Sequence, residues 1–316
     1  MPAGHLPIQF RNGVYFPHPI DTHHTATRVR NRLMEIGHPA VQSGFLPLTC
    51  AFLMTAVLRL AGWSGWGVRI ASGAIGIALL VSSILVLGLP AWPAQSGMQK
   101  FFYLTAGGLL LGVLLDLREA SSRLLVASGL VWMTTVFFWL AWPQLDSHHS
   151  LWLLAGIYLA GVMIMLRVTN RPIHDTSAPI MFLMTASSLG GIAFVAGSLS
   201  IAELGFALAA AFGGFMLWNW PQPRYRFGAA GLLGGGMSVL ALAFLVLLLT
   251  DVSPWALTSL VLIFFADSLS RRLPAGAGLL QKSLQPVYLV LLGTVPGALA
   301  VVLAWLTQQS DSLYYQ

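Results

Sequence analysis

A short basic loop followed by a run of glycines is the stretch of this chain best suited to meet an anion. The loop at 219–224 reads NWPQPR, and glycine recurs from Gly228 to Gly236. Proline fixes φ, so the two prolines predict a rigid, sharply turned loop. Glycine has no Cβ, which lets the backbone come close to a neighbouring element or to an anionic group at a helix N-terminus.

Carboxylates and arginines elsewhere add further candidates. Guanidinium forks suit phosphate, and carboxylates offer the oxygen ligands that Mg²⁺ prefers. Asp175 beside His174 could form an acid–base or metal pair, with a solvated loop pair as the plainer alternative. Asp116 could simply be a helix-end carboxylate near Arg118 and Arg123. The sequence contains no Gly-rich phosphate loop, catalytic triad or Cys/His zinc pattern.

The composition predicts an all-α polytopic membrane protein that positions these residues in its loops. Of 316 residues, 57% are hydrophobic and 8% charged, whereas soluble domains carry about 25% charged residues. Long apolar runs favour helices over a barrel. The net charge of +6 is a property of the loops, indicating orientation and anionic headgroups rather than nucleic acid.

The hydropathy pattern predicts about ten spans between a polar arm at 1–42 and a short frayed tail at 309–316, so that 43–308 forms a single membrane domain. Two of the spans, 101–116 and 254–268, are expected to be short. The spans are predicted at 44–61, 70–90, 101–116, 124–142, 151–166, 179–198, 201–218, 228–250, 254–268 and 285–306.

The arginines and lysines fall mainly at alternate connections, which the positive-inside rule places in the cytoplasm. An even number of spans then puts the arm, with four arginines of its own, outside. This conflicts with the same rule and leaves the side of the arm open.

The order of residues in 212–272 resembles the polyprenyl-phosphate N-acetylhexosamine-1-phosphate transferases of glycosyl transferase family 4. These membrane enzymes typically read N-W-P-P-A-R-I-F-M-G-D-A-G-S-x-F-L-G here, with an aspartate–threonine pair and R-R later. The residues in register are Asn219, Trp220, Pro221, Arg224, Gly228, Ala230, Gly231, Gly236, Asp267, Ser268, Arg271 and Arg272.

Three other loops resemble the family more weakly. The family ends a helix with G-L-L-D-D-x-R, where this chain has Leu115 and then Asp116. Its T-N-x-x-N-x-x-D-G-x-D-G loop matches at Asn170, while Asp175 stands one place early. Arg69 lies where the family carries P-R-G-G-G.

The resemblance implies transfer of a sugar phosphate from a UDP-sugar to polyprenyl phosphate with Mg²⁺. Ala229 replaces the family's magnesium-binding aspartate, and a methyl group cannot coordinate a hard cation. We therefore expect a catalytically impaired member without bound Mg²⁺, in a bacterial inner membrane with its motif loops cytoplasmic. It would hold polyprenyl phosphate or another anionic lipid, or partner an active enzyme of envelope polysaccharide assembly.

The implied substrate-binding residues are Asn170, Asn219, Arg69, Arg118, Arg224, Arg226, Arg271 and Arg272. A still-active transferase would use Asp116, Asp175 and Asp267 as catalytic residues. An unrelated transporter or structural subunit is the remaining alternative.

Overall fold

Helices make up every regular element of the computed structural model, which describes residues 39–62, 65–142, 148–170, 175–270 and 279–314. The elements are η1 (Val41–Phe45), α2 (Leu46–Ala61), α3 (Trp66–Ile70), α4 (Gly73–Leu87), α5 (Gly97–Leu117), α6 (Ser122–Ala141), α7 (His148–Thr169), α8 (Ser177–Val195), α9 (Leu199–Trp218), η3 (Gly231–Gly236), α10 (Met237–Leu249), α11 (Pro254–Ser259), η4 (Leu260–Phe265), α12 (Ala266–Ser270) and α13 (Leu279–Tyr314). The arm at 1–38 lies outside the described residues.

These helices form an all-α polytopic membrane protein, as the composition predicts. Within the described ranges, eight helices are long and apolar enough to cross a membrane, and two shorter apolar helices, Gly73–Leu87 and Pro254–Ser270, match the remaining two predicted spans. The prediction of a short third span is wrong, because that helix runs over Gly97–Leu117. The last helix also continues through Tyr314, where the sequence predicted a frayed tail.

Serine caps and a glycine with positive φ set several of these boundaries. The side chain of Ser96 accepts from the Gln99 N–H at the start of α5, and Ser121 does the same for Leu124 at the start of α6. Such caps satisfy backbone donors that a helix leaves unpaired. Gly88, with φ of 78°, follows the last residue of α4. Helix α4, which corresponds to the span predicted at 70–90, thus ends earlier than its hydropathy predicts.

The core lies where α8, α9 and α10 meet. In the Gly231–Leu249 window 72% of residues are buried, against 22% in Trp152–Thr169. Small residues permit this close packing: a Cβ on Gly205 of α9 would lie 2.7 Å from the Cα of Gly190 on α8, and one on Gly214 would lie 2.2 Å from the Leu48 carbonyl of α2. Glycines thus let α9 approach both α8 and α2 closely at these positions.

The connections fall alternately at two ends of the bundle. At one end, which we call the polar end, the C-terminus of α5 contacts the connection 219–230 and Arg69 forms an ion pair with Glu119. At the opposite end, Tyr103 donates to the Ala91 carbonyl and Gln308 donates to the Asp251 carbonyl. The described basic connections therefore share one end.

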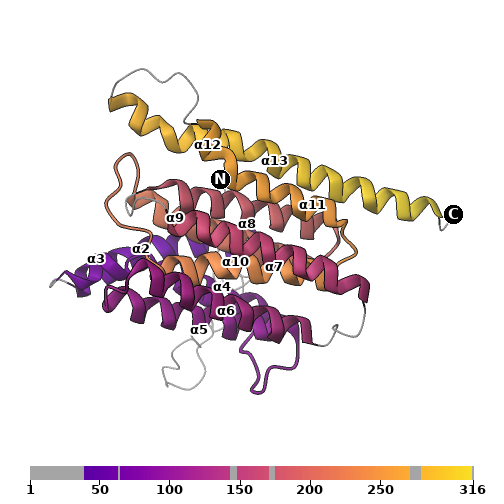
Figure 1. Ribbon diagram of the computed structural model, residues 1–316, viewed down its shortest axis with the longest axis horizontal. Helices are drawn as coiled ribbons and strands as arrows, with labels where there is room; N and C mark the ends of the chain where they lie inside the picture. The colour runs from indigo at the N-terminus through magenta and orange to yellow at the C-terminus, as the bar shows by residue number, and fades with distance from the viewer. Residues whose placement is uncertain (1–38, 63–64, 143–147, 171–174, 271–278, 315–316) are drawn as a thin grey trace, which may run out of the picture. The chain divides into compact units, whose positions relative to one another are not determined.

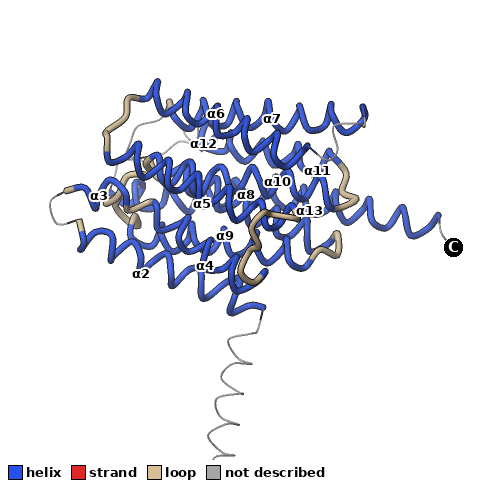
Figure 2. Tube along the Cα trace, turned by 90° about the horizontal axis from the view of Figure 1, so that it is seen from below, coloured by secondary structure: helices blue, strands red, loops and turns tan. Residues whose placement is uncertain are grey.

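Two groups of elements flank the core. Figure 2 shows α6 and α7 side by side, and α7 packs mainly on α6. On another side, α13 runs along α11 and α12 and packs closely on α8 (Figure 1). The space between α7 and α11 is important for the candidate site.

Candidate functional site

The side chain of Asn219 organises the loop that follows α9. This buried amide accepts from the N–H groups of Arg224 at 2.9 Å and Tyr225 at 2.8 Å, and donates to the Phe215 carbonyl at 3.2 Å. These bonds fold the loop back and bring Arg226 to the interior. Asn219 thus shapes the loop, and its predicted contact with substrate stays a prediction.

A carboxylate at the end of α5 caps the glycine-rich helix start. Asp116, 6% exposed, accepts from the N–H groups of Ala229 at 2.9 Å and Ala230 at 2.8 Å, one with each oxygen. A helix N-terminus carries partial positive charge and unpaired donors, so an anion is favoured there. A Cβ on Gly228 would lie 2.5 Å from Oδ1 of Asp116, which explains the need for glycine at this position.

Ser72 completes this cap from the start of α4. Its buried hydroxyl oxygen accepts from Gly231 N–H at 3.0 Å and from Gly228 N–H at 3.3 Å. The first four amides of the helix start are therefore satisfied by the chain itself. The close backbone approach predicted from the glycines is observed, and the anionic group it meets is Asp116.

A cavity of about 310 Å³ lies beside the capped helix start. Three carboxylates and one guanidinium line it: Asp116, Glu119, Asp175 and Arg226. Each of these carboxylates has a donor within the protein. Asp116 accepts from the two amides described above, Glu119 forms an ion pair with Arg69, and Asp175 accepts from the Ser177 N–H at 2.9 Å.

Arg226 is the cation of this cavity, which we call the Arg226 cavity. Its Nε is buried and has no hydrogen-bond partner within the described residues. Asp116 lines the same cavity, but both oxygens of that carboxylate already accept amide hydrogens. A buried donor without a partner is costly, so an anion entering the cavity would gain a charge-assisted hydrogen bond from Arg226.

A second polar contact lies at the same end, between α7 and α12. Arg167 donates from Nη2 to Oδ1 of Asp267 at 2.9 Å and to the hydroxyl of Ser268, and from Nε to the Phe264 carbonyl at 2.8 Å. Its guanidinium also lies 4.5 Å from the ring centroid of Phe265. Asp267 therefore has Arg167 as its partner and does not line the Arg226 cavity.

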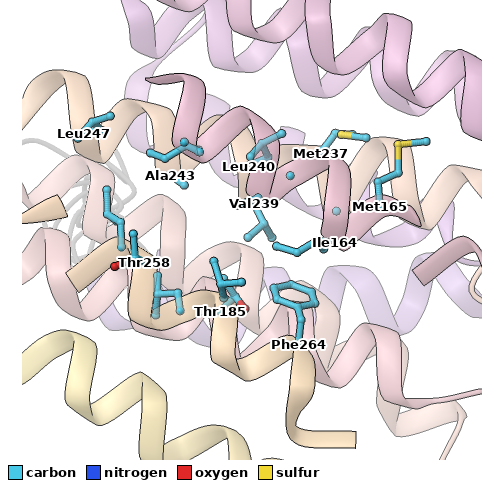
Figure 3. Close-up of a pocket in the computed structure, with 18 of the residues that line it drawn as sticks. Ile164, Met165, Thr185, Met237, Val239, Leu240, Ala243, Leu247, Thr258 and Phe264 are labelled. Carbon is cyan, nitrogen blue, oxygen red and sulfur yellow. The ribbon is translucent and has the colours of Figure 1, made fainter. Parts of the chain in front are cut away.

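An apolar groove of about 180 Å³ runs between α7 and α11–η4, and α8 and α10 also contribute to its lining, for example with Thr185 and Ala243 (Figure 3). Its lining extends along α7 from Trp152 to Met165, a length of roughly 20 Å at 1.5 Å per residue. The hydroxyls of Thr185 and Thr258 bond to carbonyls of their own helices, Met181 and Trp255. The groove is therefore suited to a hydrocarbon chain.

The apolar groove and the Arg226 cavity are neighbours. Leu232 lines both, and Met165 of the groove stands one turn before Val168 and Thr169 of the cavity on α7. An apolar surface therefore adjoins a polar cavity in which the buried Nε of Arg226 is the donor without a partner among the described residues.

The oxygen atoms near Ala229 do not form a suitable set of ligands for Mg²⁺. Both oxygens of Asp116 accept backbone hydrogens, which a bound cation would have to displace, and Ala229 has no side-chain oxygen. The described residues contain no group of three metal-ligating His, Cys, Asp or Glu side chains.

The structure brings only part of the predicted site together. Asp116, Asp175, Ala229 and Arg226 line one cavity, while Asp267 lies apart at the same end. Apart from Asn219, the other predicted site residues lie at the surface or outside the described residues. Arg118, Asn170 and Arg224 are exposed, Arg69 is paired with Glu119, and Arg271, Arg272 and His174 lie outside the described residues.

Sequence reasoning missed Ser72, Glu119 and Arg167. Arg167 carried little signal, because it directly follows the span predicted at 151–166, where a cation is typical of a connection. Ser72 carried none, since an isolated serine before a helix has many roles.

Comparison of the chain with models of protein families and with curated proteins finds no match.

Proposed function

We propose that this chain binds a polyprenyl phosphate within the membrane, on a frame like that of the polyprenyl-phosphate sugar-1-phosphate transferases. The observation that supports this most is that the apolar groove and the Arg226 cavity adjoin, with Leu232 lining both. The lipid chain would lie along α7, and its phosphate would meet the Nε of Arg226. Arg224, exposed in the same connection, would meet the phosphate from the solvent side.

The absence of side-chain oxygen at Ala229 and the engagement of Asp116 favour a binding role over catalysis. Phosphoryl transfer depends on positioned charge, so an eroded metal site costs most of its rate. In this proposal the protein holds the lipid for a partner enzyme of envelope polysaccharide assembly in a bacterial inner membrane. The polar end would be cytoplasmic, in accordance with the positive-inside rule.

A binding measurement tests this proposal. The purified chain in nanodiscs would be titrated with undecaprenyl phosphate, with the matching alcohol and with phosphatidylglycerol. A charge-assisted hydrogen bond contributes about 1.5–3 kcal/mol, so the phosphate should bind roughly 10- to 100-fold more tightly than the alcohol. Equal binding of phosphate and alcohol would contradict a phosphate site, and displacement by phosphatidylglycerol would show a general anionic-lipid site instead.

One observation favours a second candidate, a still-active transferase. Asp116 and Asp175 line the same cavity, as a catalytic pair would. Release of UMP from a UDP-sugar in the presence of Mg²⁺ and undecaprenyl phosphate would support this candidate, provided that Asp116→Asn abolishes it. We expect no release above that of empty nanodiscs.

A further inference from the structure

The two walls of the apolar groove are supported unequally. The wall formed by α11 and η4 is braced by α13 and α8, whereas α7 packs mainly on α6 and only lightly on α10 and η4. In the α7 window only 22% of residues are buried. The α6–α7 pair is therefore the wall with fewer restraints, and a movement that widens the groove would occur there most easily.

At the polar end, one side chain ties the two walls together. Arg167 of α7 reaches the Phe264 carbonyl and the carboxylate of Asp267, whose side chain is only 7% exposed. We call these contacts the Arg167–Asp267 latch. A largely buried ion pair that also carries hydrogen bonds to neighbouring groups holds two elements in a defined arrangement.

The latch is directly connected to the groove lining. Met165, which lines the groove, precedes Arg167 by two residues, and Phe264 contributes its ring to the lining and its carbonyl to the latch. The segment Leu260–Phe265 is a 3₁₀ helix between two α-helical pieces. A 3₁₀ stretch within a helix often marks a hinge.

We propose that the Arg167–Asp267 latch keeps the apolar groove narrow when it is empty and opens to admit a lipid chain. Opening separates α7 from η4 and α12 at the polar end, and the chain then enters between α7 and α11. This inference rests on the proposed function for the identity of the occupant, while the latch itself is argued from the contacts alone.

Distance measurements between spin labels test the latch. With Cys50, the single cysteine of the chain, changed to serine, labels would be attached at Leu159→Cys on α7 and Leu262→Cys on η4. These two side chains are 65% and 55% exposed, so the labels point away from the core. The distance distribution would be recorded in nanodiscs for the latched protein, for Asp267→Asn and Arg167→Gln, and for Arg123→Gln as an exposed control at the same end.

Both latch variants should shift the distribution to longer distances or broaden it, and Arg123→Gln should leave it unchanged. Undecaprenyl phosphate should shift the latched protein in the same direction, and Asp267→Asn should bind this lipid about 5-fold more tightly or better. Arg167→Lys, which keeps the charge but lacks the planar fork, replaces Arg167→Gln if that variant does not fold.

Unchanged distances in both latch variants would overturn the latch. A shift in the latch variants without lipid binding to any form would support the latch and refute the proposed function, so the two failures are distinguishable.

Discussion

Asp116, at the end of α5, accepts a hydrogen bond from the backbone N–H of Ala229 at 2.9 Å, although 113 residues separate the two in sequence. The other oxygen accepts from Ala230 at 2.8 Å. Ala229, which has no side-chain oxygen, therefore holds through its amide a carboxylate from another helix. The anion that a helix start attracts is supplied by the protein itself.

Removing that carboxylate should destabilise the protein. Asp116→Ala leaves two buried N–H groups without acceptors, which costs about 2–4 kcal/mol. Asp116→Asn should cost less, because its amide oxygen still accepts from one of them. Thermal unfolding in detergent micelles measures both, with Glu119→Gln at an exposed position as the control. Equal stability of Asp116→Ala and the control would show that the cap contributes nothing.

Glycine at position 228 should be required for the same contact. Gly228→Ala places a methyl group 2.5 Å from Oδ1 of Asp116, so the carboxylate or the helix start must move, at a cost of about 1–3 kcal/mol. Gly44→Ala is the matched control, since nothing lies within 4 Å of a Cβ there. If the two variants unfold at the same temperature, the close approach of α5 to the helix start is not tight in solution.

Sequence patterns predicted the helical membrane fold well, because the hydropathy of a span can be calculated without knowing which helices pack beside it. They predicted the site only in part. The glycines at 228–236 indicated a close backbone approach. However, no residue near them in sequence indicates that Asp116 and Ser72 are the groups that accept hydrogen bonds from this helix start. Likewise Asp267 was predicted from a motif, whereas its partner Arg167 is 100 residues away. Pairings across the bundle depend on tertiary packing, which local patterns do not encode.

Arg226 should determine the affinity for the phosphate head. Arg226→Gln removes the charge and the buried Nε donor, so binding of undecaprenyl phosphate should fall about 10- to 100-fold while binding of the alcohol stays the same. Arg123→Gln, an exposed arginine at the same end, should change neither. A parallel loss for phosphate and alcohol would mean that Arg226 supports the loop and not the ligand.

A larger side chain in the part of the lining that α10 contributes should block the apolar groove. Ala243 of α10 lines the groove (Figure 3), and Ala243→Phe would fill space that a lipid chain needs. We expect undecaprenyl phosphate binding to fall at least about 10-fold, with a thermal midpoint close to that of the unchanged protein. Leu159→Phe, on the outward face of α7, is the control. Unimpaired binding in Ala243→Phe would place the lipid elsewhere.

Photo-crosslinking with a polyprenyl phosphate that carries a diazirine in its second isoprene unit tests the central claim most directly. The labelled peptides would be mapped by mass spectrometry in the nanodisc-embedded protein. We predict labels on α7 between Trp152 and Met165 and on α10 between Leu240 and Leu247, with labelling competed by unmodified undecaprenyl phosphate and reduced in Arg226→Gln. Labels confined to the outward faces of α2 and α13, equal in both proteins and not competed, would contradict the account.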